Sequence, residues 1–179
     1  MSLVIIINGS GTSGKDTVAH IVDRHVNNTF VYNISSIDKV REAARILGWT
    51  GEKLDHDREF LHQLKMLATK FYDHSLFYML ESHDKYKKTY KNNLLGKMMI
   101  GFFHIREPEE IEKFKIEILK RGDRVLTLLI TRDNITKFAN EADKNVGEYQ
   151  YGYVIDNSGT IEELKEKVVN LFNKILNGE

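Results

Sequence analysis

The sequence predicts an α/β fold in which a parallel sheet of five strands is covered by helices. Short apolar runs rich in β-branched residues alternate with longer segments whose apolar residues recur at helical spacing. The first apolar run shows no polar alternation, which is typical of a strand that is covered on both faces. A glycine-rich turn joins this run to the first helical segment, as in proteins that bind phosphate groups.

Length and composition narrow the class of protein further. The 179 residues fit one domain, so we expect a single domain over residues 1–179. Basic and acidic residues are equal at 26 each, which disfavours nucleic acid and anionic membranes as partners. Cysteine is absent, which excludes disulfides and thiolate chemistry and suits a reducing compartment. We therefore expect a soluble cytoplasmic protein with small-molecule partners, no membrane partner and an oligomeric state that the sequence leaves open.

The first strand is predicted at Leu3 to Ile7, and the glycine-rich turn follows it directly. Its spacing of Gly9, Gly14 and Lys15 matches the Walker A pattern, in which backbone N–H groups and a lysine surround phosphate oxygens. Asp16 stands where a hydroxyl residue usually holds magnesium, and the hydroxyl comes one place later, at Thr17. The turn therefore predicts a phosphate site with one departure from the common pattern.

Helices and strands alternate in the first half of the chain. We expect a helix from Lys15 to Val26, a strand from Phe30 to Ile34, a helix from Ile37 to Leu47 and a helix from Gly51 to Tyr72. The apolar residues of the last of these helices predict its buried stripe, which comprises Phe60, Leu61, Leu64, Leu67, Ala68 and Phe71.

The second half continues the alternation. A helical segment around Leu76 to Leu80 precedes a polar loop or helix end at Lys85 to Asn93. The remaining strands are predicted at Met98 to Phe103, Val125 to Ile130 and Tyr151 to Ile155. One helix starts at Pro108 and ends near Arg121, and the final helix is capped by Thr160 with Glu163 in capping-box register.

Two stretches exceed what the sheet needs. The helical material at about 35–95 is longer than a crossover between two strands requires, so it is predicted as an insertion that binds a second substrate. The polar segment at about 133–150 is predicted as a lid. A phosphate loop, a second pocket and a lid together favour phosphoryl transfer over hydrolysis, because a closing lid excludes water.

Several charged residues are placed to reach a ligand. Arg106 and Glu107 follow the third strand at the edge where parallel strands open a crevice. Asp38 and Arg41 share a helix face that borders the same crevice, although a solvated ladder of charges is the commoner outcome of such a pattern. For Arg58, phosphate contact and ordinary surface ion pairing are equally compatible with the sequence. The seven histidines show no metal-binding spacing.

The loop segment Ser13-Gly14-Lys15-Asp16-Thr17 resembles that of the phage-type deoxynucleoside monophosphate kinases, a group within the P-loop nucleoside monophosphate kinase-like superfamily. Phosphomevalonate kinases of the same superfamily also carry Gly-Lys-Asp in this loop. Similar segments extend along nearly the whole chain, at Ser35 to Val40, Gly51 to Leu61, His104 to Glu110 and Asp156 to Thr160. The resemblance implies a three-layer P-loop NTP hydrolase-type fold with a helical acceptor-binding insertion.

The resemblance also implies roles for individual residues, with ATP and Mg²⁺ as cofactors. The loop residues that would wrap the ATP phosphates are Gly9, Ser10, Gly11, Thr12, Ser13 and Gly14. Lys15 would bridge the β and γ phosphates, Thr17 would touch a phosphate, and Asp16 and Thr17 would hold the metal. Arg132 would lie against adenine, and Asn157 would belong to the turn that borders it.

The acceptor side is implied in the same way. Ser36, Asp38, Arg41 and Glu107 would bind the acceptor, a nucleoside monophosphate. Arg58 and Arg106, with Lys15, would neutralise the phosphoryl group in transfer.

This chain departs from the family pattern at two places. His104 stands where the family has an aspartate, and only Lys137 and Lys144 supply positive charge in the predicted lid. The alternatives to a nucleotide kinase are therefore a kinase of another phosphorylated metabolite and a nucleotide-binding protein without catalytic activity.

Overall fold

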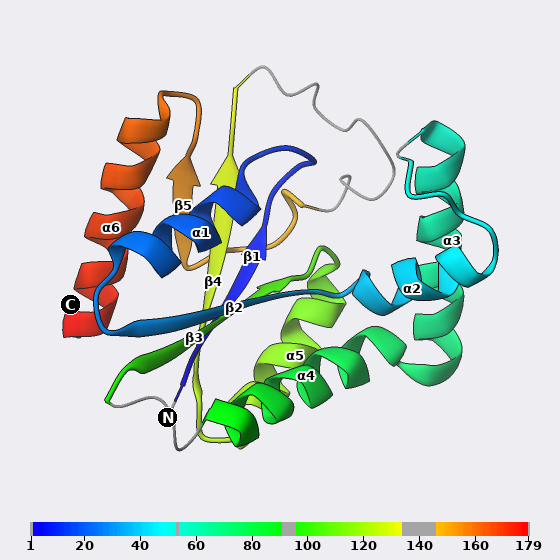
Figure 1. Cartoon of the computed structure of the whole chain (residues 1–179), viewed down its shortest axis with the longest axis horizontal. Coiled ribbons are helices and arrows are strands. Elements are labelled where there is room, and N and C mark those ends of the chain that lie inside the picture. Colours follow the sequence, from blue (N-terminus) through cyan, green and yellow to red (C-terminus); the bar gives the residue numbers. More distant parts are fainter. Residues whose placement is uncertain (1, 53, 91–95, 134–145, 179) are drawn as a thin grey trace.

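The computed structural model describes residues 2–52, 54–90, 96–133 and 146–178, and in these it contains one sheet of five parallel strands. The strands are ordered β2-β3-β1-β4-β5, so β1 is central and pairs with β3 and β4 (Figure 1). Their bounds are Leu3–Asn8 for β1, Thr29–Ser35 for β2, Met98–His104 for β3, Arg124–Thr131 for β4 and Tyr153–Asp156 for β5. The predicted parallel sheet is confirmed.

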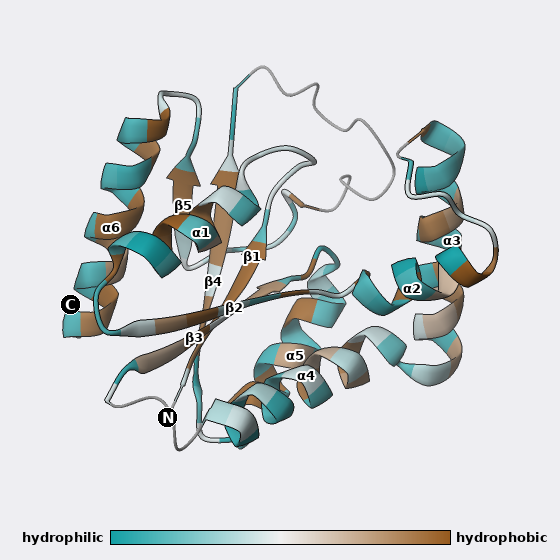
Figure 2. Cartoon of the chain, viewed as in Figure 1, coloured by the Kyte–Doolittle hydropathy of each residue, from teal (hydrophilic) through white to brown (hydrophobic). Residues whose placement is uncertain are grey.

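Helices cover both faces of this sheet. The two hydrophobic cores divide the side chains of β1 between them: Leu3, Ile5 and Ile7 point to one face, and Val4 and Ile6 point to the other. The first core includes α1 (Lys15–His25) and α6 (Ile161–Asn177), and the second includes α4 (His74–Tyr90) and α5 (Pro108–Lys120). In Figure 2 the hydrophobic colours run along the strands and along the sheet side of these helices. The arrangement is the expected three-layer sandwich.

The two remaining helices, α2 (Asp38–Ile46) and α3 (Asp55–Tyr72), lie beyond the edge of the sheet (Figure 1). They have a small core of their own, formed by Val40, Ala44 and Leu61 with Trp49 packed against it. The long helix α4 is part of the main body of the fold, because its residues Met79 and Leu80 are buried in the second core of the sheet. Within the stretch 35–95, α4 therefore serves as a layer of the sandwich, and α2 and α3 are the helices that lie outside it.

The predicted start of α3 is wrong. Gly51 has a φ of +99° and lies in a bend, and the helix begins four residues later, at Asp55. The carboxylate of Asp57 accepts a hydrogen bond from the backbone N–H of Leu54 at 3.1 Å, which fixes the first turn there.

The predicted buried stripe of α3 is also wrong in part. Leu61 is buried, but Leu67 is 57% exposed and Phe71 is 64% exposed. The helix rests on its neighbours through Asp57, Leu61 and Lys65 instead. An apolar face therefore remains on the outside of the molecule.

Two further boundaries differ from the expectations. The helix α4 continues to Tyr90. Lys85 therefore lies within this helix, whereas the sequence predicts a polar loop or a helix end from Lys85 onward. The last strand starts at Tyr153, because the backbone N–H of Gly152 bonds to the hydroxyl of Thr127 and not to the sheet ladder. In the described parts of the chain, none of the helices combines the length and the hydropathy that a bilayer crossing needs.

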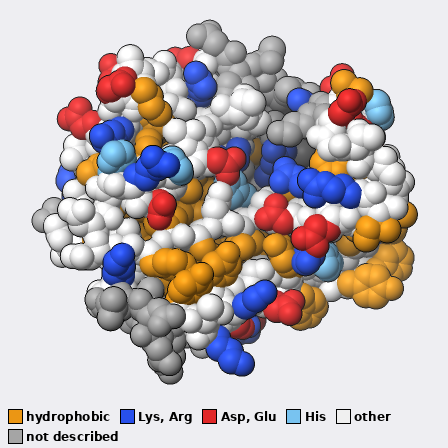
Figure 3. All heavy atoms as spheres, viewed as in Figure 1, with side chains coloured by type: hydrophobic (Ala, Val, Ile, Leu, Met, Phe, Trp, Pro, Cys, Tyr) orange, Lys and Arg blue, Asp and Glu red, His pale blue; other side chains and the backbone are white. Residues whose placement is uncertain are grey.

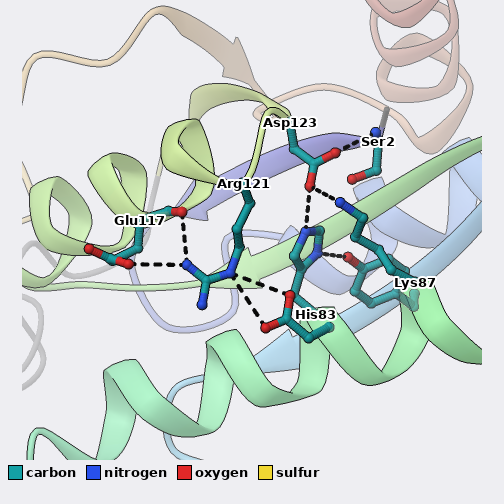
Figure 4. Close-up of polar contacts among 8 residues, drawn as sticks. Ser2, His83, Lys87, Glu117, Arg121 and Asp123 are labelled. Carbon is teal, nitrogen blue, oxygen red and sulfur yellow. Dashed lines mark hydrogen bonds and ion pairs between the residues drawn. The ribbon is translucent and has the colours of Figure 1, made fainter.

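A buried polar network lies at the amino-terminal edge of the sheet (Figure 4). His83 accepts a hydrogen bond from the Tyr32 hydroxyl at Nδ1 (2.5 Å) and donates from Nε2 to Asp123 (3.0 Å). Asp123 also accepts from Lys87 Nζ (2.5 Å) and from the Ser2 backbone N–H (2.8 Å). Burial lowers the pKa of His83 against the opposing effect of Asp123, so the imidazole is neutral at pH 7. The network therefore joins α4, β2 and the amino ends of β1 and β4 through satisfied polar groups.

We expect Asp123→Asn to lower the free energy of unfolding by about 1.5–3 kcal/mol, because it removes the charge from several buried hydrogen bonds. Burial alone would raise the pKa of Asp123, but the bonds from Lys87 and His83 outweigh it and lower this pKa from 3.8 to about 2. The stability that this carboxylate contributes is thus present above about pH 4 and is lost as the pH falls towards 2. Urea unfolding of both proteins between pH 2.5 and pH 7 measures it.

The matched control is Asp84→Asn, which removes an exposed carboxylate that pairs with Arg121 at 3.3 Å. It should change stability by less than about 1 kcal/mol. Equal losses in the two variants would contradict the importance of the buried network.

Candidate nucleotide and phosphate site

The glycine-rich loop lies at the carboxyl end of the central strand, between β1 and α1. Gly9, at its start, has a φ of +147°, and a Cβ atom there would lie 2.4 Å from the carbonyl oxygen of Ile130. Its backbone N–H donates to Asn8 Oδ1 at 2.8 Å. The amide nitrogen of Asn8 donates in turn to the carbonyl oxygen of Arg106 (3.1 Å) and to the hydroxyl of Tyr151 (2.6 Å). Only glycine fits this approach between the loop and β4.

The end of the loop is held by Asn157. Its side-chain amide donates to the carbonyl oxygen of Ser13 at 2.8 Å, in a buried position. Gly14 has a φ of +103°, and a Cβ atom there would lie 2.4 Å from the Asn157 amide nitrogen. Asn157 was expected to belong to the turn that borders adenine, and in the structure its side chain also contacts the phosphate loop through Ser13.

Lys15 is the first residue of α1, and its ammonium group folds over the loop. Lys15 Nζ donates to the carbonyl oxygens of Gly9 (2.7 Å) and Ser10 (2.8 Å) and lies 3.4 Å from Ser13 Oγ. A cation is therefore held where phosphate oxygens would meet the loop, as the sequence predicts.

The start of α1 supplies the second component of a phosphate site. Gly14 occupies the N-cap position, where no side chain caps the helix, and Asp16 and Thr17 follow in the first turn. The positive end of the helix dipole and its first N–H groups favour an anion at this place. The loop, helix end and lysine therefore fit the phosphates of a nucleotide.

Asp16 is joined to two residues across the crevice. Asn33, at the end of β2, donates from Nδ2 to Asp16 Oδ1 at 3.0 Å, and its Oδ1 lies 2.7 Å from His104 Nε2. His104 Nε2 lies 3.6 Å from the same Asp16 oxygen. The exposed carboxylate of Asp16 keeps acceptor capacity for a cation or its water, so Asp16 with the hydroxyl of Thr17 fits the hard oxygen ligands of Mg²⁺.

Asn33 was missed by the sequence analysis because a single polar residue at the end of a strand carries no pattern. Within the described ranges there is no group of three or more His, Asp or Glu side chains that suits a metal ion. A metal held here would consequently take most of its ligands from phosphate and water.

His104 is surrounded by positive charge. Burial is the main cause that lowers its pKa to about 4, Asp16 opposes this, and the charges of Lys15, Arg41 and Arg106 lower it further. The imidazole is therefore neutral at pH 7 and donates from Nε2 to Asn33. The charges of the predicted residues Lys15, Asp16, Arg41 and Arg106 thus all act on this one side chain.

At the start of α2, the Asp38 side chain bonds to two neighbouring residues of the chain. Its Oδ2 accepts from the backbone N–H of Ser35 at 2.8 Å, and its Oδ1 pairs with Arg41 at 3.3 Å. Ser36 is buried, and its N–H donates to the carbonyl oxygen of His104 at 3.2 Å. Figure 3 shows Lys and Arg side chains gathered beside acidic ones on the face that includes α2. The start of α2 is therefore fixed to the end of β3.

The other predicted residues lie further out. Arg58 is exposed in α3, and Arg132 is exposed just past the end of β4. Glu107 caps α5 and borders a cavity of about 460 Å³ that Met66 and Leu76 also line. Lys65 of α3 forms a nearly buried ion pair with Glu110 at 2.7 Å.

The predicted lid falls mostly on residues 134–145, outside the described residues. Its last part, 146–150, is anchored: Val146 is buried, and its carbonyl oxygen accepts from the Tyr151 hydroxyl at 3.1 Å. The Tyr149 hydroxyl bonds to Glu112 of α5.

Several solved structures share this fold. The tunicamycin resistance protein of Deinococcus radiodurans has a TM-score of 0.55 at 16% identity, over 96% of each chain. The APS kinase CysC of Mycobacterium tuberculosis, in complex with AMPPNP and APS, has a TM-score of 0.51 at 16% identity, over 96% of this chain and 98% of that one. The protein TT1252 of Thermus thermophilus has a TM-score of 0.50 at 15% identity, over 97% of each chain.

These likenesses show the fold alone, which the chain shares with the APS kinase. Neither the comparison with protein-family models nor the comparison with curated proteins gives a match.

We expect Asn157→Asp to weaken ATP binding at least about tenfold, because it sets a carboxylate against the Ser13 carbonyl oxygen and adds negative charge behind the loop. The control Asn173→Asp adds the same charge on an exposed position of α6 and should leave ATP affinity unchanged. Calorimetric titration of ATP measures both, and equal affinity of the two variants would show that Asn157 does not support the loop.

Proposed function

We propose that the protein is an ATP- and Mg²⁺-dependent phosphotransferase whose acceptor is a nucleoside or deoxynucleoside monophosphate. The observation that carries this proposal is that the positive charges of Lys15, Arg41 and Arg106 all act on His104, at the end of β3, while Lys15 Nζ is bonded to the glycine-rich loop. A bare phosphate-binding loop needs only the first of these cations. Two further arginines at the crevice provide charge for a second anionic group, which a phosphorylated acceptor carries.

The donor side of the reaction rests on the loop and on Lys15. The loop and the start of α1 would orient the ATP phosphates, and Lys15 would exchange its bonds to Gly9 and Ser10 for phosphate oxygens. A Mg²⁺ ion held by Asp16 and Thr17 would neutralise part of the phosphate charge. The APS kinase of the same fold was solved with AMPPNP, which supports ATP as the nucleotide.

The acceptor side rests on the end of β3 and the start of α2. Arg106 follows β3 directly, and the bond from Asn8 to its carbonyl oxygen ties its backbone to the strand that leads into the loop. Arg41 is oriented by Asp38, whose own position is fixed by Ser35. These arginines would hold the acceptor phosphate in line with the donor. Ser36 and Glu107 would bind the acceptor with Asp38, and Arg58 would help neutralise the phosphoryl group in transfer.

We expect Lys15→Met to reduce turnover by about a hundredfold or more while the protein stays folded, because one cation in the site is lost. The assay measures diphosphate formation from a panel of ribo- and deoxynucleoside monophosphates, with phosphomevalonate and APS as acceptors of other classes. The control Lys120→Met removes an exposed lysine of α5 and should keep wild-type turnover. If no member of the nucleotide panel is phosphorylated in a manner that depends on Lys15, the nucleotide kinase proposal fails.

We expect Arg41→Ala to raise the KM for the acceptor at least about tenfold and to change the KM for ATP little, because Arg41 lies on the acceptor side. The control Arg45→Ala removes an exposed cation one turn further along α2 that stacks on Trp49. Steady-state kinetics with each substrate varied separately give both constants. An equal rise in the two KM values would contradict the assignment of Arg41 to the acceptor.

A second function is favoured by one observation. His104 is a neutral imidazole at the place where related kinases carry a carboxylate, so the second acidic group beside Asp16 is absent from this position. A protein that binds nucleotides without transferring phosphate would show ATP binding by calorimetry and no turnover with any acceptor of the panel.

A further inference from the structure

The exposed face of α3 has a regular pattern. Phe60, Leu64, Leu67 and Phe71 are separated by four, three and four residues, a spacing that follows the helical turn and aligns them in one stripe. Phe60 is 37% exposed, Leu67 57% and Phe71 64%, so most of the stripe faces outward. We call these four residues the α3 stripe. Figure 3 shows hydrophobic side chains gathered on this side of the molecule, over the end of α3.

Most of the stripe lies outside the cores of the monomer. Leu64 packs against the small core of Val40, Ala44 and Leu61, and Phe60, Leu67 and Phe71 belong to none of the described hydrophobic cores. The helix α3 is attached to the rest of the chain through Asp57, Leu61 and Lys65, which are buried and lie about a quarter-turn away. Beside α3 lies a groove of about 730 Å³, which is bordered by Phe60, Leu64 and Leu67 of the stripe and by Glu59 and Lys70. Apolar patches rimmed by polar residues mark interaction surfaces in soluble proteins.

The order of residue types along the stripe suits contact with a second copy of the same helix. The stripe runs Phe, Leu, Leu, Phe at intervals of four, three and four residues, so it has the same pattern when it is read from either end. Two copies of α3 packed antiparallel about a two-fold axis would therefore set Phe60 of one copy against Phe71 of the other, and Leu64 against Leu67. An isologous interface requires this kind of self-complementarity.

The charged residues beside the stripe are complementary in an antiparallel pair. Glu59 and Lys70 immediately precede Phe60 and Phe71, so an antiparallel pair of helices brings Glu59 of each copy near Lys70 of the other. Gln63 Nε2 donates to Glu59 at 2.6 Å and holds the carboxylate along this flank, while Lys70 Nζ lies 5.7 Å from the centroid of the Phe71 ring. In a parallel pair, the flanks that carry Glu59 and Lys70 would lie on opposite sides of the contact, so these two charges would not meet across it.

We propose that the protein forms a two-fold symmetric homodimer through antiparallel contact of its α3 stripes. A standard interface covers about 800 Å² per partner, and one helix with four apolar residues supplies less than this. The dissociation constant is therefore expected on the order of 1–100 μM.

Sedimentation velocity of the full chain from about 1 to 300 μM tests the proposal. The wild type should shift with concentration from 20.8 kDa towards twice this mass. Leu67→Glu should weaken the dimer at least about tenfold, because it places two charges in the apolar centre. The control Ile116→Glu adds the same charge at a residue of α5 that is 50% exposed and should dimerise as the wild type does.

Charge reversal tests the antiparallel order and avoids the apolar residues. Glu59→Lys and Lys70→Glu should each weaken the dimer about threefold or more, and the double variant should return to within about twofold of the wild type. Circular dichroism confirms that each variant is folded. The proposal is overturned by a wild type that stays monomeric or binds lipid vesicles instead, by a folded Leu67→Glu that still dimerises, or by a double variant that is not restored.

Discussion

The contact between Asn157 and the end of the glycine-rich loop determines the geometry of the candidate site. The amide of Asn157 bonds to Ser13, and its nitrogen occupies the space that a side chain at position 14 would need. The loop can therefore turn into α1 only with a glycine there, and the first turn of α1 is left without a side-chain cap. The position of Lys15 over the loop and the anion-binding end of the helix both follow from this contact.

The two edges of the sheet use buried histidines differently. At the amino edge, His83 has a partner for each nitrogen and joins four elements of the fold. At the carboxyl edge, His104 is kept neutral largely by burial, and the charges of Lys15, Arg41 and Arg106 lower its pKa further. Stability is thus concentrated at one edge and the candidate chemistry at the other, as is usual for open α/β sheets.

The sequence predicts the sheet, the phosphate loop and most helices well, because each has a local signature. The strands are short apolar runs, and Gly9, Gly14 and Lys15 have a fixed spacing that few other sites share. Asn8 and Asn33 could not be predicted, since their role depends on which strand ends become neighbours in the sheet. The same holds for Asn157, whose side chain meets a loop 144 positions earlier in the chain.

The error on the α3 stripe has a different cause. Periodicity shows that a helix has an apolar face, but it does not show what covers that face. For Leu67 and Phe71, the covering element is absent from the described part of the chain. The helix is held instead by the Lys65 to Glu110 pair, which a pattern of apolar residues does not include.

That ion pair also limits how α3 can move. Both side chains are almost removed from water, and separating them would leave a charge uncompensated at a cost of several kcal/mol. Sliding α3 away from α5 is therefore unfavourable, whereas tilting it about this point keeps the pair intact. The pair acts as a pivot, and because Glu110 lies in the first turn of α5, the pivot is only four residues from Arg106. A tilt of α3 about this point would change the distance from Arg58 to the phosphate loop while Arg106 stays in place.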